Sequence, residues 1–530
     1  MKEKRKMKLK KFNFHPITSF IVLTLFTIIL SWILSSFQLE ATYNTINQKT
    51  GQLETTIITV NNLLGYNGVK YIISNAAKNF ASFTPLSTLL IALIGLSVAY
   101  ASGLIDAFIK KVTLNVDNKI ITFILILIAI FSSIINEVGY VILIPLAALI
   151  FLANGRNPIL GITAAFCGVA FGYGATLFVG SMEINLISDT TLAAALIDPA
   201  YHVSLTSNLF IIMAFSIIIA LIGTLVIEKI IVNIIGKYKK PEETYETQEV
   251  KTLDITTHEQ KKLEIELKEK RGLKRATIAG IIIILIFIYM IIPGLPASGM
   301  LLDLDEFAYV NKLFGPNSYF QDGFTYMVSL FFVVTGIAYA TGAKTLKNDK
   351  ALIEKASEYL KDIGHLVALI FFASQFIAVF KETNIGTLIV AWGANIINSL
   401  SFTGIPLIIL VLIVIAISNL FVTTPTLKWQ ILAPVVVPLM MQSNISPEFA
   451  QFVLRAGDSI TKGISPLLAY FVIYLGYLNI YNQNKEAITI KKAISYIMPY
   501  CLIIGAVWIL LIIGWYLIGL PIGPGVYPTL

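Results

Sequence analysis

The sequence predicts an all-α polytopic membrane protein with about nine transmembrane helices and two re-entrant helical hairpins in an inverted repeat. Of the 530 residues, 56% are hydrophobic and only 13% are charged, whereas soluble domains carry about 25% charged residues. The mean hydropathy of +0.79 is spread over the whole chain, in apolar runs near the ~20 residues that span a bilayer. Basic residues gather in alternate connecting segments, a pattern typical of multi-pass proteins.

The first half of the chain, residues 17–232, follows a basic segment at 1–16. Its first apolar run, 17–39, is too long for a signal-peptide core and lacks a small-residue cleavage site after it, so we expect a retained span. Further apolar runs cover 84–104, 119–153, 158–182 and 203–232. Polar residues at 132–139 interrupt the run 119–153, which is therefore predicted to be a hairpin that enters and leaves on the same side.

A charged segment at 233–275, with eleven basic and nine acidic residues, divides the chain near its middle. We expect it to be a solvated cytoplasmic linker. The second half, 276–530, has apolar runs at 276–294, 325–343, 364–391, 404–441, 448–480 and 494–519. The run 404–441 is broken near 418–429 and is predicted to be the second hairpin. The run 448–480 is expected to break at 455–462.

The distribution of basic residues places the N-terminus in the cytoplasm. The segment 344–363 contains five lysines, whereas the segments 183–202 and 520–530, on the opposite side in this topology, contain no lysine or arginine. If either hairpin crossed the membrane fully, a basic segment after it would face outward, against the positive-inside rule. The same rule attributes the net charge of +8 to cytoplasmic loops, so no nucleic-acid partner is expected.

The motif content argues against an enzyme or an ATP-driven pump. The sequence has no Walker loop and no HExxH motif, and its four histidines are far apart. The two cysteines, Cys167 and Cys501, both lie in apolar runs, so neither a disulfide framework nor a cysteine metal site is expected. No cofactor is expected beyond a coupling ion, H⁺ or Na⁺.

The two predicted hairpins share an order of elements. Glu137 precedes Pro145 by eight residues in the first, and Thr426 precedes Pro434 by eight in the second. A second broken segment follows each hairpin, at 172–185 and at 455–463. Because the topology enters the hairpins from opposite sides, the halves form an inverted repeat, the architecture of many secondary transporters.

Polar residues at these breaks are the candidate binding residues, because broken helices at membrane depth are tolerated where they are buried in protein or line a polar cavity. A charge at the bilayer centre costs ~3 kcal/mol on insertion scales, so Arg455 and Asp458 should be paired or face a cavity. Arg455 either pairs with Asp458 to hold the bundle together or clamps a substrate carboxylate. The full set is Asn136, Glu137, Glu183, Asn419, Thr424, Thr426, Trp429, Pro447, Arg455, Asp458 and Ser459.

Several of these residues allow two interpretations. The tip residues either bind substrate or ion or simply cap helices, and their oxygen atoms would suit Na⁺ near Asn419, Thr424 and Asp458. Trp429 either stacks on an aromatic substrate or lies at a membrane interface. Glu183 either senses protons or faces the outer solvent. Lys428 is expected to snorkel toward the membrane surface, and Pro447 to begin a helix.

The sequence resembles the AbgT family, the p-aminobenzoyl-glutamate transporters of the ion transporter superfamily. The matching motifs, which extend over nearly the whole chain, include Gly139-Tyr-Val-Ile-Leu-Ile-Pro-Leu146, Gly155-Arg-Asn-Pro158, Asp198-Pro-Ala-Tyr201, Lys428-Trp429 and Arg455-Ala-Gly-Asp458-Ser459. The resemblance implies a bowl-shaped homodimer in the inner membrane of a bacterium, with nine spans and two hairpins per protomer. It implies import of p-aminobenzoyl-glutamate, or proton-driven export of sulfonamides, with a Na⁺ site at the hairpin tips.

The resemblance places functional residues on Glu183, Asn419, Thr426, Trp429, Pro447, Arg455 and Asp458. Two features depart from the family pattern. The acidic residue after the first break is typically Asp but is Glu183 here, and the second tip is typically richer in Ser, Ala and Gly than the segment 422–426.

The leading interpretation is a secondary transporter of p-aminobenzoyl-glutamate or related sulfonamides, driven by an H⁺ or Na⁺ gradient. Its partners would be the small-molecule substrate, the lipid bilayer and a second copy of the chain. The main alternative is a Na⁺-coupled dicarboxylate carrier of the same superfamily, in which Trp429 would be dispensable. A remote alternative is an intramembrane enzyme with a dyad of Glu137 and Asp458. A channel is disfavoured because inverted hairpins favour alternating access.

Overall fold

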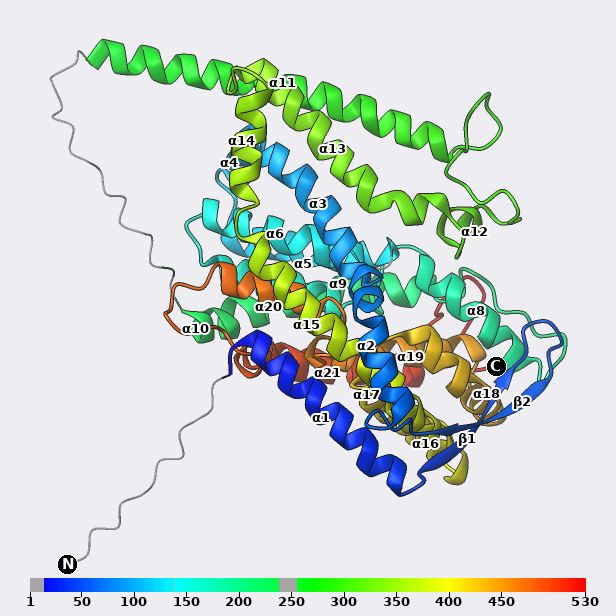
Figure 1. Cartoon of the computed structure of the whole chain (residues 1–530). Helices are drawn as coiled ribbons and strands as arrows, with labels where there is room; N and C mark the ends of the chain where they lie inside the picture. Colours follow the sequence, from blue (N-terminus) through cyan, green and yellow to red (C-terminus); the bar gives the residue numbers. More distant parts are fainter. Residues whose placement is uncertain (1–13, 136, 237, 239–254) are drawn as a thin grey trace, which may run out of the picture.

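The computed structural model describes residues 14–135, 137–236, 238 and 255–530, with the backbone alone for 255–263 (Figure 1). Most of the basic N-terminal segment and the candidate residue Asn136 lie outside the described residues. The helices before the linker are α1 (Pro16–Ser36), α2 (Tyr66–Ala81), α3 (Thr84–Ala101), α4 (Leu104–Thr113), α5 (Asn118–Phe131), α6 (Val138–Ala153), α7 (Pro158–Phe171), α8 (Ser181–Ala194), α9 (Leu209–Val226) and α10 (Val232–Ile235). A short 3₁₀ helix, η1 (Ser132–Ile135), follows α5, and a π-helical segment, η2 (Ile227–Ile231), joins α9 to α10.

The second half is also helical. Its elements are α11 (Ile255–Ile291), α12 (Tyr309–Phe314), α13 (Tyr319–Ala343), α14 (Asp349–Tyr359), α15 (Ile363–Glu382), α16 (Ile385–Ser399), α17 (Gly404–Asn419), α18 (Pro425–Gln442), α19 (Pro447–Thr461), the turn η3 (Lys462–Ile464), α20 (Phe471–Ile480) and α21 (Ile490–Ile518). The backbone of α11 thus begins inside the segment expected to be a linker.

The described residues contain eight helical stretches long and apolar enough to cross a membrane. They are Pro16–Ser36, Tyr66–Ala101, Asn118–Ile135, Leu209–Ile235, Glu264–Ile291, Tyr319–Ala343, Ile363–Glu382 and Ile490–Ile518. Shorter apolar helices, including α6, α7, α16, α17 and α20, lie among them. The prediction of a helical polytopic membrane protein is confirmed.

A small antiparallel sheet follows α1, in a polar stretch for which the sequence predicted no structure. Strands β1 (Glu40–Ile46) and β2 (Leu53–Thr59) pair with Glu40 opposite Thr59. The sheet lies along α16, where the Trp392 indole nitrogen donates to the Glu40 carbonyl at 3.3 Å and the Asn395 amide donates to the Thr42 carbonyl at 3.2 Å. The β-branched residues of these strands were a usable signal for it.

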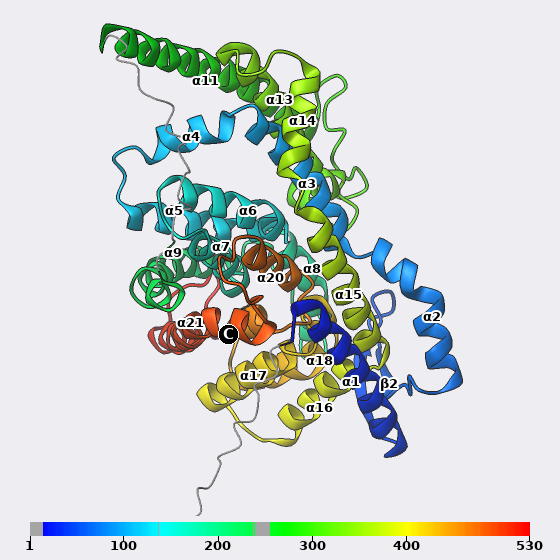
Figure 2. The ribbon, with the colours of Figure 1, turned by 60° about the vertical axis from the view of Figure 1, so that its left-hand side comes forward.

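The helices form two regions. In the first, here called the scaffold region, α3 packs on α13 and α14, α11 packs on α13, and α1 and α2 pack on α15. In the second, here called the hairpin region after the two hairpins that the sequence predicts, α5 and α6 pack on α7, α17 packs on α19, and α8 packs on α18. Figure 2 shows α11, α13, α14 and α3 running along one flank, beside the hairpin region.

Two predicted helix boundaries are wrong. The run 364–391 is not one helix, because α15 ends at Glu382 and Asn384 adopts a left-handed conformation (φ 62°) before α16 begins. The break expected at 455–462 comes later, because α19 continues unbroken through Arg455 and Asp458 to Thr461. Buried partners for these charges, described below, make a helix break there unnecessary.

Candidate functional site

Helix α19 carries a polar stripe inside the protein. Ser446 caps it by accepting a hydrogen bond from the Phe449 N–H, Pro447 begins it, and every residue from Pro447 to Ser459 is buried. Along the chain beyond this cap, Gln451, Arg455, Asp458 and Lys462 follow one another at spacings of four, three and four. Residues at these spacings share one face of a helix. The stripe therefore presents one amide, two cations and one carboxylate to the surrounding helices.

Arg455 forms an ion pair with Glu183, in the first turn of α8. The same carboxylate accepts a hydrogen bond at 3.2 Å from the Gly180 N–H, which lies at the N-terminus of α8. The sequence allowed Arg455 to pair with Asp458, and Glu183 to face the outer solvent. Both interpretations are wrong, because α8 packs against α19 and buries Glu183 to 1% exposure.

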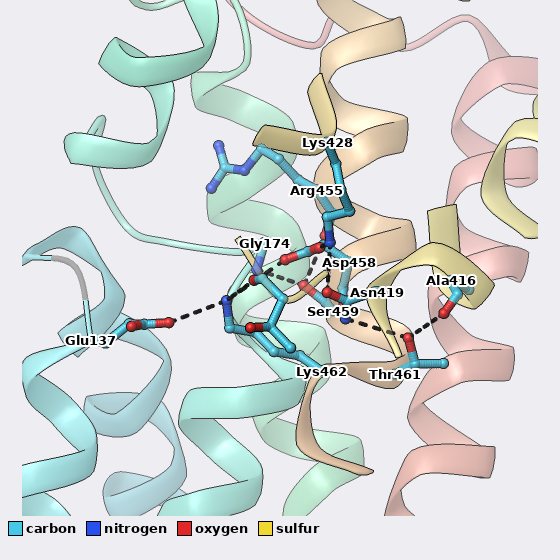
Figure 3. Close-up of polar contacts among 11 residues, drawn as sticks. Glu137, Gly174, Ala416, Asn419, Lys428, Arg455, Asp458, Ser459, Thr461 and Lys462 are labelled. Atoms are coloured by element: carbon cyan, nitrogen blue, oxygen red, sulfur yellow. Dashed lines mark hydrogen bonds and ion pairs between the residues drawn. The ribbon is translucent and has the colours of Figure 1, made fainter. Parts of the chain in front are cut away.

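The Arg455 guanidinium keeps donors to spare. Its Nε and Nη2 atoms are buried and have no hydrogen-bond partner within the described part of the chain. Figure 3 shows the guanidinium directed away from the group around Asp458. A buried donor without an acceptor costs about 1–3 kcal/mol, so these atoms are suited to receive a bound anion.

Asp458 lies against Lys428, which lies in the first turn of α18, just after the tip of the second predicted hairpin. The Lys428 ammonium forms an ion pair with the Asp458 carboxylate and donates to Asn419 Oδ1 at 2.6 Å. The Asn419 amide in turn donates to the Asp458 carbonyl at 2.7 Å. Snorkelling of Lys428 is therefore wrong. Because α18 begins within the protein, its first turn points Lys428 into the interior, where it is fully buried.

Lys462 joins the two hairpin tips (Figure 3). Its ammonium lies 3.3 Å from Glu137 Oε1 in the first hairpin, and 3.7 Å from Asp458 Oδ2. It lies 3.5 Å from the Thr423 carbonyl in the second tip and 3.5 Å from the centre of the Tyr173 ring. Lys462 was missed as a site residue, although its position four residues after Asp458 in an apolar run was a usable signal.

A second polar network surrounds Trp429. Its indole N–H donates to the Thr190 hydroxyl at 2.8 Å, and that hydroxyl lies 2.6 Å from Gln451 Oε1. Trp429 is completely buried, so a place at the membrane interface is excluded. Among the described residues, Gln451 Nε2 has no hydrogen-bond partner. Thr190 and Gln451 were missed, since a single threonine or glutamine in an apolar context is a weak signal.

Gly174 lies in the break between α7 and α8, and at this residue the break packs against α19. Its N–H donates to Ser459 Oγ at 2.7 Å, and Ser459 donates to the Arg455 carbonyl at 2.8 Å. A Cβ atom on Gly174 would lie only 2.6 Å from that carbonyl oxygen. The close approach therefore requires glycine, and it places the first-half break directly beside Arg455 and Ser459.

A sequence profile of the AbgT putative transporter family matches residues 11–530. The chain belongs to this family. The p-aminobenzoyl-glutamate transport protein of Escherichia coli (strain K12) is 30% identical over 517 residues, which cover 97% of this chain and 94% of that protein. Membership of a transporter family, together with the apolar helices, makes this a multi-pass membrane protein.

Two solved structures are also similar. The YdaH transporter of Alcanivorax borkumensis is 29% identical, with a TM-score of 0.46, over 96% of this chain and 100% of that one. MtrF of Neisseria gonorrhoeae, described with a class of antimetabolite efflux pumps, is 31% identical, with a TM-score of 0.48, over 97% of this chain and 98% of that one.

The AbgT-family chain does not assemble the predicted Na⁺ ligands as expected. Asn419 and Asp458 come together, but the Lys428 ammonium contacts both of them. Thr424 has an exposed side chain that makes no capping hydrogen bond, and Thr426 is half-buried in the first turn of α18. The Lys428 ammonium therefore occupies the position between Asn419 and Asp458 at which the sequence predicted Na⁺. Because a cation already lies there, these residues do not fit a metal ion.

The ionic groups of this site balance one another. Its carboxylates are Glu137, Glu183 and Asp458, and its cations are Lys428, Arg455 and Lys462. Of the six, Glu137 is the most exposed, with 28% of its side chain accessible. Buried charges persist when they are paired and hydrogen-bonded, so an additional ion would need a new counter-charge or would displace one of the six.

Proposed function

We propose that this chain is a secondary active transporter of p-aminobenzoyl-glutamate or of related aromatic antimetabolites such as sulfonamides, driven by an H⁺ or Na⁺ gradient. The observation that carries the proposal is a set of buried donors on one face of α19. Arg455 Nε and Nη2 and Gln451 Nε2 lie one helical turn apart and have no acceptor among the described residues. Such donors suit a ligand with several acceptor oxygens.

The chemistry of p-aminobenzoyl-glutamate matches these groups. A carboxylate of its glutamate part would take the two free Arg455 donors in the bidentate geometry that guanidinium favours. Its amide carbonyl would accept from Gln451, and its ring would stack near Trp429. Sulfonamides share the aminophenyl ring, and so belong to the same proposed substrate class. The named relative from Escherichia coli supports this class.

The proposal includes the cellular setting. The chain would lie in the inner membrane of a bacterium as a homodimer, with its N-terminus in the cytoplasm, and would alternate access between the two sides. The basic segments at 1–16 and 344–363 support this orientation. The inverted order that the sequence predicts for the two hairpins supports alternating access, since many secondary transporters are built in this way.

Transport in sealed vesicles tests the proposal. Radiolabelled p-aminobenzoyl-glutamate flux is measured with imposed H⁺ and Na⁺ gradients varied separately, for the wild type, Arg455→Lys and the exposed-site control Lys361→Met. We expect flux in the wild type and the control, and a drop of about tenfold or more in Arg455→Lys, because lysine cannot form the bidentate pair.

Competition with unlabelled compounds defines the substrate class in the same assay. A sulfonamide should compete and succinate should not. Trp429→Ala should reduce the flux of the aromatic substrate more than Trp429→Phe. If folded wild-type protein moved succinate but neither aromatic compound, the dicarboxylate-carrier alternative would replace this proposal.

A further inference from the structure

Lys462 has the surroundings of a bound cation. Its ammonium is fully buried and lies among a Glu137 oxygen at 3.3 Å, an Asp458 oxygen at 3.7 Å and the Thr423 carbonyl at 3.5 Å. The face of the Tyr173 ring covers it at 3.5 Å. Carboxylate and carbonyl oxygens are the ligands that hard cations take in proteins, and an aromatic face also attracts a cation.

These ligands come from four separate parts of the chain. Glu137 belongs to the first hairpin tip and Thr423 to the second, while Tyr173 lies in the break after α7 and Asp458 lies in α19. The ammonium therefore stands where the two halves of the inverted repeat meet. In transporters of this architecture, unwound carbonyls and half-helix ends beside the breaks are where a coupling cation is held.

With Lys428 and Lys462 both present, each carboxylate oxygen of Asp458 faces an ammonium group. One carboxylate oxygen of Asp458 pairs with Lys428 and the other faces Lys462. A metal ion that used either oxygen would lie within a few ångströms of an ammonium, in a buried setting where the repulsion of like charges is poorly screened. With the six charges already balanced, the cluster provides no anion to compensate for it.

We propose that the Lys462 ammonium is a tethered cation that takes the place of a bound alkali ion between the two hairpin tips, so that the chain binds no Na⁺ there and its transport does not require Na⁺. The test of this proposal by transport rests on the function proposed above. The test by Na⁺ binding needs no substrate. The proposal narrows the choice between H⁺ and Na⁺ as the coupling ion. It excludes Na⁺ from the position between the two hairpin tips, where this architecture would otherwise bind it.

The proposal predicts that removing the tether creates a Na⁺ site. Lys462→Ala deletes the ammonium and its stem, and leaves Glu137, Asp458 and the Thr423 carbonyl around a vacant space. Lys462→Arg keeps a cation on a side chain at the same position. The double variant Lys462→Ala with Glu137→Gln removes the negative charge of one ligand of the created site. Lys361→Ala is the matched control, because Lys361 forms an exposed pair with Glu358 at 3.3 Å.

Purified protein is melted in NaCl and in choline chloride at equal ionic strength, and ²²Na⁺ binding is measured directly. Because a ligand that binds only the folded state raises Tm with its concentration, Lys462→Ala should gain a saturable Na⁺-dependent rise of about 2 °C or more. Wild type, Lys462→Arg and Lys361→Ala should melt at the same temperature in both salts and bind no ²²Na⁺. The double variant should lose most of the gain.

Flux measurements then test the consequence for transport. Replacing Na⁺ by choline at constant pH should change wild-type flux by less than about twofold, whereas residual flux in Lys462→Ala should depend on Na⁺ by about tenfold, within the range typical of coupling between two binding sites. Saturable ²²Na⁺ binding that stabilises the wild type would overturn the proposal. A folded Lys462→Ala protein with no response to Na⁺ would overturn it equally.

These outcomes remain separable from the proposed function. If no tested compound is transported, the substrate assignment fails, while melting and ²²Na⁺ binding still decide the role of Lys462. If Lys462→Ala does not fold, the wild-type measurement decides it alone. Na⁺ binding by the wild type then overturns the proposal, and the absence of binding supports it.

Discussion

Helices α11 and α19 show opposite relations between polarity and burial. The apolar part of α11 exposes its side chains, with Ile281 53% exposed and Leu285 58% exposed. In α19 the polar stripe is sealed inside the protein, and Arg455 and Asp458 are completely buried. In water both arrangements would be unfavourable. In a bilayer both are expected, because lipid solvates apolar surface and the protein must satisfy its own polar groups.

The two helices also differ in what depends on them. An apolar side chain that faces lipid contacts acyl chains and has no specific partner within the protein. Another apolar residue can therefore replace it at little cost. Arg455 and Asp458 on α19 each have a charged partner on another element, Glu183 on α8 for Arg455 and Lys428 on α18 for Asp458. The comparison therefore predicts that sensitivity to substitution follows the polar stripe and not hydrophobicity.

The largest effect is expected from Arg455→Met. It leaves the Glu183 carboxylate buried without its cation, and breaking a buried pair in this way costs ~3–5 kcal/mol. We expect a large fall in Tm, and loss of transport by about 100-fold or more in whatever protein remains folded.

The double variant Arg455→Met with Glu183→Gln separates stability from function. It removes both charges, so it should recover most of the Tm without recovering transport. Melting of purified protein and flux in vesicles measure the two effects. Full transport by the double variant would show that Arg455 serves the bundle and not the substrate.

An intermediate effect is expected from Gly174→Ala, which tests how closely the first-half break packs against α19. The added Cβ would meet the Arg455 carbonyl oxygen at 2.6 Å and Ser459 Oγ at 2.7 Å. Forcing an extra methyl into such a contact costs ~1–3 kcal/mol. The control Gly514→Ala adds the same group on α21, where nothing lies within 4 Å.

Melting temperature and flux are measured for both glycine variants. Gly514→Ala should match the wild type in both, because its methyl group meets open space. Equal behaviour of the two variants would contradict the close approach between the first-half break and α19.

The sequence predicted the fold more fully than the site. Long apolar runs marked most of the spans, because the bilayer thickness requires each spanning helix to have about 20 apolar residues, and runs of that length are visible in the sequence. It did not reveal the helix break at Asn384, which depends on one residue in a left-handed conformation. It also missed the sheet at 40–59, although the β-branched residues of both strands were a usable signal, because this stretch is polar beside the apolar runs that flank it.

At the site, the sequence identified Arg455, Asp458 and Glu183 as unusual because charges in apolar runs are conspicuous. It did not identify their partners. Pairing Arg455 with Glu183 requires α8 to pack on α19, and pairing Lys428 with Asp458 requires the second hairpin to turn inward. Both are properties of the tertiary structure. The spacing between residues of one helix cannot supply them.

The smallest effect is expected from Leu285→Ala, on the exposed face of α11. If this face lies in lipid, the substitution removes no packing within the chain, and Tm and flux should match those of the wild type, within about 0.5 kcal/mol of stability. Melting at several protein concentrations provides the sharper measurement. A loss of stability that grows on dilution would mean that a second copy of the chain covers this face, because the stability of an oligomer depends on protomer concentration. Exposed apolar side chains on α11 would then mark an interface between subunits, and the contrast with α19 would hold for the polar stripe alone.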